Sequence, residues 1–78
     1  MMKAYVLIET EKGKTNEVVK AIRKLKGILS VDAVTNPYDA IAIVMGDTLS
    51  DVGSIVTVDF GRIAGICRTV TCAQLVYS

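Results

Sequence analysis

The chain has 78 residues, a mass of 8.4 kDa, a net charge of +1 and an apolar content of 51%. A chain of this size forms one domain, and we expect residues 1–78 to be that domain. The balanced charge argues against a strongly electrostatic nucleic-acid binder, which needs a large basic excess. The sequence has no histidine, which excludes Ser-His-Asp and Cys-His catalysis and removes the commonest metal ligand.

The apolar runs and the first residues of the sequence bear on the cellular location. No apolar run approaches the roughly 18 residues that a membrane span requires. The first residues lack the apolar stretch and cleavage site of a signal peptide. We therefore expect a cytoplasmic protein with no membrane partner.

The small size of the chain creates a need for extra support. A domain this short buries only roughly 60% of its unfolded surface, so it needs disulfides, a metal or a partner chain. Cys67 and Cys72 are an odd number of residues apart in an expected strand, which places them on opposite faces and argues against a bridge. A C-x4-C pair without histidine is not a metal site. Oligomerisation is the remaining source of support, and we expect no cofactor.

The first third of the chain predicts a strand followed by a helix. Residues 3–9 are β-rich and apolar on both faces, which favours a strand. Residues 15–26 repeat apolar positions at helical spacing, with basic residues in the last turn. Thr15 and Asn16 are candidate N-caps, and Gly27 suits the position after the helix.

The middle of the chain predicts two strands joined by a turn. Residues 28–35 alternate as a strand, and the Asn36–Asp39 segment carries turn residues that include a proline. Residues 40–45 form a continuous apolar run, which is typical of a strand buried on both faces.

The last third is less clear. Apolar positions recur at helical spacing from residue 49 to 63, but residues 56–60 also alternate as a strand would. We interpret residues 48–59 as a helix that Thr48 could cap. Gly61 and Gly65 bracket a loop, and residues 66–77 form the last strand.

The resulting order is βαββαβ, the α+β ferredoxin-like arrangement with an antiparallel sheet. Its strand order is 4-1-3-2, which places the two strands that are apolar on both faces, 3–9 and 40–45, at the centre. Both helices then cover one face of the sheet and leave several hundred Å2 of apolar surface on the other. We expect a second chain to cover that face, sheet against sheet, as in a dimeric α+β barrel.

Two motifs carry a resemblance to a known family. The run VTNPYDAIAIV at residues 34–44 and the run IAGICRTVT at residues 63–71 resemble the "V-T-G-x-Y-D" hairpin and the "I-P-G-V" strand of the RAM domain. This domain is the effector-binding and oligomerisation half of Lrp/AsnC transcription regulators. The hairpin glycine of the family is Asn36 here, and asparagine tolerates left-handed geometry. The family's helix-turn-helix domain has no counterpart before the first strand, so the chain resembles a stand-alone RAM domain.

The resemblance implies a homodimer, often assembled into rings of dimers, that binds an amino acid between neighbouring dimers. It further implies that Asn36, Tyr38 and Asp39 line this site, with Thr69 and Thr71 donating hydrogen bonds from the last strand. Such a protein would be a non-enzymatic sensor without direct DNA contact. It would act through mixed assemblies with full-length Lrp/AsnC regulators or by relaying the ligand state to another partner.

Other interpretations of the same residues stay open. Asp39 could be a turn residue that caps backbone, and Tyr38 could be an apolar plug at an interface. Thr69 and Thr71 could reflect β-propensity alone. The lysine-rich helix could be a solvated face or a nucleic-acid patch. The alternative functions are a small dimeric α+β barrel enzyme, monooxygenase-like, and a purely structural oligomer.

Overall fold

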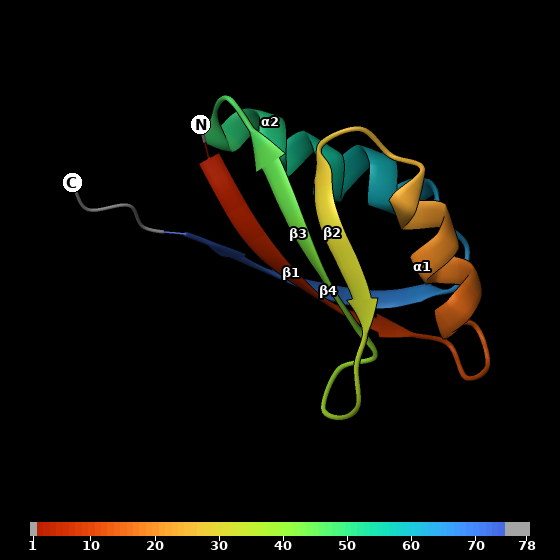
Figure 1. Cartoon of the computed structure of the whole chain (residues 1–78). Coiled ribbons are helices and arrows are strands. Elements are labelled where there is room, and N and C mark those ends of the chain that lie inside the picture. Colours follow the sequence, from red (N-terminus) through yellow and green to blue (C-terminus); the bar gives the residue numbers. More distant parts are fainter. Residues whose placement is uncertain (1, 75–78) are drawn as a thin grey trace.

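The computed structural model describes residues 2–74 and has the predicted βαββαβ order (Figure 1). A π-helical segment, η1, and a 3-10 turn, η2, extend the second helix. The elements in chain order are β1 (Met2–Thr10), α1 (Thr15–Arg23), β2 (Ile28–Ala33), β3 (Ala40–Gly46), α2 (Leu49–Ser54), η1 (Ile55–Asp59), η2 (Phe60–Arg62) and β4 (Ile66–Ala73).

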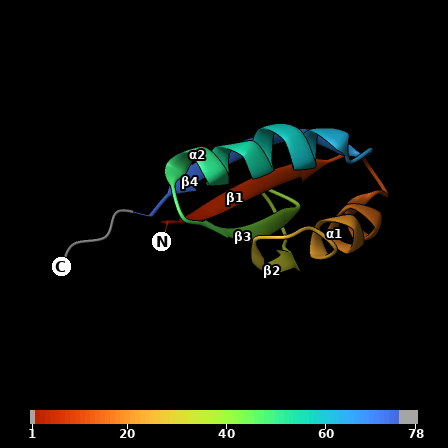
Figure 2. The same cartoon turned by 90° about the horizontal axis from the view of Figure 1, so that it is seen from above.

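The four strands form one antiparallel sheet in the order β2-β3-β1-β4. This order confirms the prediction, with β1 and β3 at the centre. Both helices lie on one face of the sheet, as the view from above makes clear (Figure 2). The fold class is therefore the ferredoxin-like α+β arrangement.

The core lies between this face of the sheet and the helices. Alternate side chains of the central strands are fully buried, among them Val6 and Ile8 of β1 and Val44 of β3. The amphipathic α1 contributes Val18 and Ile22 to the same cluster. The remaining buried members are Ala4, Val19, Val31, Ala40, Ala42, Val52 and Phe60. The strand alternation thus decides which face is buried, and the opposite face stays open.

The first helix is shorter than predicted at its carboxyl end and differs at its cap. It ends at Arg23 instead of residue 26, and its N-cap is Lys14, with no side-chain hydrogen bond. The prediction that Thr15 or Asn16 caps the helix is therefore wrong. Thr15 instead shares a hydrogen bond with Thr10 through their hydroxyl oxygens, 2.8 Å apart. Gly27 follows the helix with a positive φ of +82°. Residues with an L side chain disfavour this conformation, so a glycine suits this position.

The second helix begins as predicted. Thr48 is the N-cap, its hydroxyl accepts from the backbone N–H of Asp51 at 3.1 Å, and the Asp51 carboxylate accepts from the backbone N–H of Thr48 at 3.2 Å. This reciprocal pair is a capping box. The chain then widens into the π-helical η1 and tightens into η2, so it stays helical through Arg62. The expected loop is thus shorter, and the strand-like alternation of residues 56–60 is misleading because a π-helix has its own spacing.

The ends of the strands also differ from the predictions: β1 is one residue longer at each end, and β3 is one residue longer at its carboxyl end. β2 ends at Ala33, two residues before the predicted 35, because the turn residues begin the connecting loop earlier. β4 ends at Ala73, so residue 74 of the predicted strand lies beyond it, and the predicted positions 75–77 lie outside the described residues.

Candidate functional site

The loop of residues 34–39 joins β2 to β3 and carries three of the predicted site residues. The backbone N–H of Val34 donates to the carbonyl of Asp39 at 2.9 Å and closes the base of the loop. Asn36 is exposed and Tyr38 is half-buried. Among residues 2–74, positive φ occurs only at glycines. Asn36, which stands where the family has its hairpin glycine, therefore does not adopt left-handed geometry.

Asp39 links this loop to the carboxyl end of β1. Its backbone N–H donates to the carbonyl of Ile8 at 2.9 Å. Its carboxylate Oδ2 accepts from the backbone N–H of Thr10 at 2.8 Å. The register of β1 with β4 shifts between Glu9 and Thr10, and a bulge of this kind leaves a backbone group to be satisfied by other means. Asp39 therefore holds the bulge, and one hydrogen bond still leaves most of its acceptor capacity unused.

Thr69 and Thr71 lie on a different part of the sheet from this loop. In the register of β1 with β4, Thr69 pairs with Ile8 and Thr71 with Val6. They therefore share the helix-facing side, and β1 separates them from the end of β3. Each strand spacing is about 4.8 Å. One chain alone does not bring the threonines and the Asn36–Asp39 residues together.

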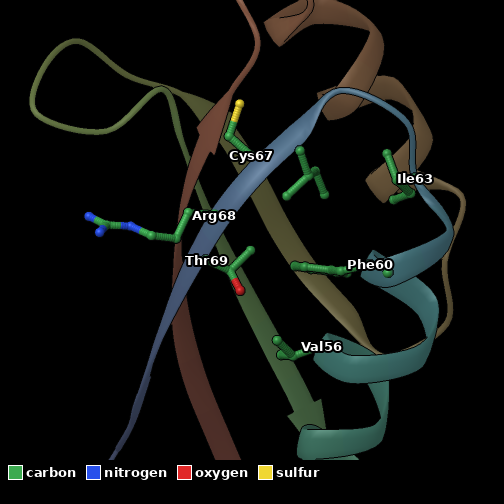
Figure 3. Close-up of a pocket in the computed structure, with 8 residues that line it drawn as sticks. Val56, Phe60, Ile63, Cys67, Arg68 and Thr69 are labelled. Carbon is green, nitrogen blue, oxygen red and sulfur yellow. The ribbon is translucent and has the colours of Figure 1, made fainter.

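The structure also contains a groove that the sequence did not reveal. It has a volume of about 180 Å3 and lies between the start of β4 and the η1 and η2 segments. Figure 3 shows Val56 and Phe60 pointing from the helical side toward Thr69, while Arg68 points away. The other lining residues are Gly61, Ile63, Ile66 and Cys67. Small-molecule sites usually span about 300–1,000 Å3, so this groove is small for a ligand pocket.

The open face of the sheet is largely apolar. In the strand register Tyr5 pairs with Ile43 and Cys72, and Leu7 pairs with Ile41 and Val70. Paired residues in an antiparallel sheet share a face. Tyr5 is 37% exposed, and Leu7 is half-buried. At one end of this face, Arg68 and Glu9 form an ion pair with a nitrogen–oxygen distance of 2.8 Å.

Chemistry-bearing clusters are sparse in the part of the chain that the structure describes. Cys67 and Cys72 are both free and exposed. Among residues 2–74, no three side chains of His, Cys, Asp or Glu gather as metal ligands would. None of the helices in this range has the length and apolar character needed to cross a bilayer.

The fold and these features match one family along almost the whole chain. The model of the Lrp/AsnC ligand binding domain matches residues 3–75. The chain therefore belongs to the Lrp/AsnC ligand-binding domain family, a family of transcription-regulator domains. A search of curated proteins finds no match.

Several solved structures share this fold. The protein TTHA0845 from Thermus thermophilus is 28% identical, with a TM-score of 0.93, over 100% of this chain and 98% of that one. The protein PHS023 from Pyrococcus horikoshii is 27% identical, with a TM-score of 0.90, over 99% and 93%. AsnC from Escherichia coli is 14% identical, with a TM-score of 0.89, over 97% of this chain and 52% of AsnC. The chain thus spans about half of AsnC and nearly all of the first two proteins.

Proposed function

We propose that this protein is a stand-alone amino-acid sensor whose oligomers modulate Lrp/AsnC transcription regulators in the cytoplasm. In this proposal two copies cover each other's open sheet face, and an amino acid binds at the loop of residues 34–39 between neighbouring dimers. In mixed assemblies with full-length regulators, the bound or free state of the ligand site then changes how those regulators control transcription. The protein has no catalytic role and makes no direct contact with DNA.

The apolar composition of the open sheet face supports the proposed dimer. Tyr5, Leu7, Ile41, Ile43 and Val70 share this face, and apolar patches of this kind on soluble proteins mark interaction sites. A small domain also gains stability from burying such a surface in a partner. Since all five side chains belong to the same sheet face, a second copy of the sheet can bury them together.

The observation that supports amino-acid binding is the position of Asp39. Its carboxylate lies at the base of an exposed loop and retains acceptor capacity beyond its bond to Thr10. A carboxylate suits the ammonium group of an amino acid, and backbone N–H groups suit its carboxylate. A regulator of the same fold from Neisseria meningitidis, 17% identical, was solved as a complex with L-Met. Asn36 and Tyr38 of the loop, and Thr69 and Thr71 of a neighbouring copy, would complete the site.

A thermal-shift screen against the twenty amino acids, with light scattering on the same samples, tests this function. At a ligand concentration 100-fold above Kd, binding stabilises the folded state by about 2.7 kcal/mol per site. We expect one or a few amino acids to raise the melting temperature and change the assembly mass. Asp39→Asn should remove both responses and leave the dimer intact, because it keeps an acceptor for Thr10 but lacks the charge. Unchanged affinity in Asp39→Asn would contradict the site.

A purely structural oligomer is the second candidate, and the bond between Asp39 and Thr10 favours it. This contact gives the Asp39 carboxylate a role in the fold without any ligand. If no amino acid shifts the melting temperature of a protein freed of bound ligand by unfolding and refolding, the structural function replaces the sensor function.

A further inference from the structure

The charges of this small molecule are separated into a basic part and an acidic part. Residues 12–26, which form α1 and its two flanking turns, contain six lysines or arginines and one acid, Glu17. Residues 27–61 contain five aspartates and no basic residue. The net charge of +1 is therefore the sum of a basic region and an acidic region. Regions of opposite charge attract complementary surfaces of other molecules.

The basic part is an exposed surface on the outer side of α1. Lys20, Arg23 and Lys24 are all exposed, while the apolar side of the helix, with Val18 and Ile22, is buried in the core. Among the neighbouring charges, Glu17 pairs with Lys14 at 3.6 Å. Arg23 donates to the carbonyl of Val31 at 3.4 Å. We call Lys20, Arg23 and Lys24 the basic surface.

The acidic part includes an exposed apolar side chain at the start of α2. Leu49 is 58% exposed, the highest value among the large hydrophobic residues of the described chain. Asp47 and Asp51, both exposed, flank it in the sequence. An apolar centre within a polar rim is the usual anatomy of a protein interface. We call Asp47, Leu49 and Asp51 the acidic surface.

The two surfaces are not neutralised within one copy. The ion pairs of residues 2–74 are Lys14 with Glu17 and Arg68 with Glu9, and neither joins α1 to α2. Both helices cover the same face of the sheet (Figure 2). If the open sheet face is buried in the proposed dimer, both surfaces point outward from that dimer. They are then available to a neighbouring dimer.

We propose that the basic surface of one copy docks onto the acidic surface of a copy in a neighbouring dimer. This inference rests on the proposed sheet-face dimer and names the contact that assembles dimers further. Lysine and arginine heads pair with Asp47 and Asp51, and their aliphatic stems cover Leu49. The balanced net charge favours a second copy over a polyanion, because the complementary surface is present on every copy. The contact is heterologous, so it builds rings or filaments of dimers.

Mass measurement by multi-angle light scattering at low and high salt tests the contact. Exposed ion pairs weaken as the Debye length falls from about 10 Å at 0.1 M salt to about 3 Å at 1 M. We expect assemblies larger than a dimer at about 0.1 M that dissociate to dimers at about 1 M salt. The double variant Lys20→Glu/Lys24→Glu should stay a dimer at both salt concentrations, with docking weakened at least about tenfold.

Charge reversal on the other side provides a complementation test. Asp47→Lys/Asp51→Lys should also stay a dimer. This variant loses the bond from the Thr48 N–H to the Asp51 carboxylate but keeps the bond from the backbone N–H of residue 51 to the Thr48 hydroxyl. Mixing the two double variants should restore the larger assembly at low salt, because the basic and acidic surfaces have exchanged places. Arg62→Glu changes the net charge as much as Lys24→Glu does alone but lies outside α1, so it should not weaken docking. Circular dichroism confirms that each variant is folded.

Several outcomes overturn the proposal and separate it from the proposed function. A wild-type mass that does not change with salt, or mixed variants that remain dimers, excludes this contact while leaving the sheet-face dimer in place. A monomer at every salt concentration refutes the dimer itself. A DNA duplex that binds wild type but not Lys20→Glu/Lys24→Glu, with the protein remaining a dimer, assigns the basic surface to a polyanion instead.

Discussion

The carboxylate of Asp39 accepts a hydrogen bond from the backbone N–H of Thr10 across the end of the sheet, at 2.8 Å. The same residue donates its own N–H to the carbonyl of Ile8. Asp39 therefore fastens the loop of residues 34–39 to β1 at the point where the register shifts. A residue proposed to bind a ligand thus also stabilises the fold, and substitutions must separate the two roles.

Replacing Asp39 by alanine and by asparagine separates these roles. Asp39→Ala leaves the partly buried N–H of Thr10 without its partner, which should cost about 1–3 kcal/mol of unfolding free energy. Asp39→Asn keeps an acceptor oxygen and should cost less than about 1 kcal/mol. Urea unfolding of both variants measures the difference. Equal stability of the two variants would show that the bond to Thr10 contributes little.

Gly65 and Gly13 form a matched pair for testing close packing. Both have positive φ, +99° and +81°, which disfavours any L side chain. A Cβ at position 65 would lie 3.1 Å from a methyl carbon of Val18 and 3.2 Å from Cβ of Lys14, whereas one at position 13 meets nothing within 4 Å. Gly65→Ala should therefore destabilise by about 1 kcal/mol or more beyond Gly13→Ala.

Thermal or urea unfolding of the two glycine variants gives this difference directly. The backbone cost is similar in both, so the excess reports on contact between the segment before β4 and α1. If Gly13→Ala proves as costly as Gly65→Ala, the packing argument fails and only the backbone conformation matters.

The capping box of α2 predicts a graded response at Thr48. Thr48→Ala removes the acceptor for the N–H of Asp51 and should lower the unfolding free energy by about 1 kcal/mol. Thr48→Ser keeps the hydroxyl and should stay within a few tenths of a kcal/mol of wild type. Ser50→Ala, at an exposed neighbouring position, serves as the control. A destabilised Ser50→Ala would indicate that the loss at Thr48 is not a capping effect.

The fold was predictable because patterns at several levels agree. The continuous apolar run at residues 40–45 and the apolar strand at 3–9 identify the two central strands, and Thr48 predicts the start of α2. The errors have local causes. Residues 56–60 alternate as a strand would, but they lie in the helical segments η1 and η2. Lys14 is the cap in place of Thr15, because the Thr15 hydroxyl bonds to Thr10 instead.

The candidate site was less predictable because contacts between distant residues decide it. The sequence places Asp39 in a turn, but only the strand register brings its carboxylate to Thr10. The groove beside Phe60 and Thr69 depends on how η2 approaches β4, which no local pattern specifies. The open face was expected, but which residues lie on it required the structure, which buries Ile8 and leaves Tyr5 exposed.

A charged side chain at the centre of the open face tests the proposed dimer. Ile43 pairs with Tyr5 on one side and Ser30 on the other, so it lies near the middle of this face. Ile43→Lys should dissociate the dimer, because covering the face would bury an unpaired charge. Val58→Lys, at a position that is 46% exposed on η1, is the matched control and should keep the dimer. Sedimentation velocity measures both masses. The monomer of Ile43→Lys should also melt at a lower temperature than wild type, since a domain this short buries only roughly 60% of its unfolded surface. A folded dimer of Ile43→Lys with wild-type affinity would assign the interface to another surface, whereas dissociation of both variants would point to a general loss of stability.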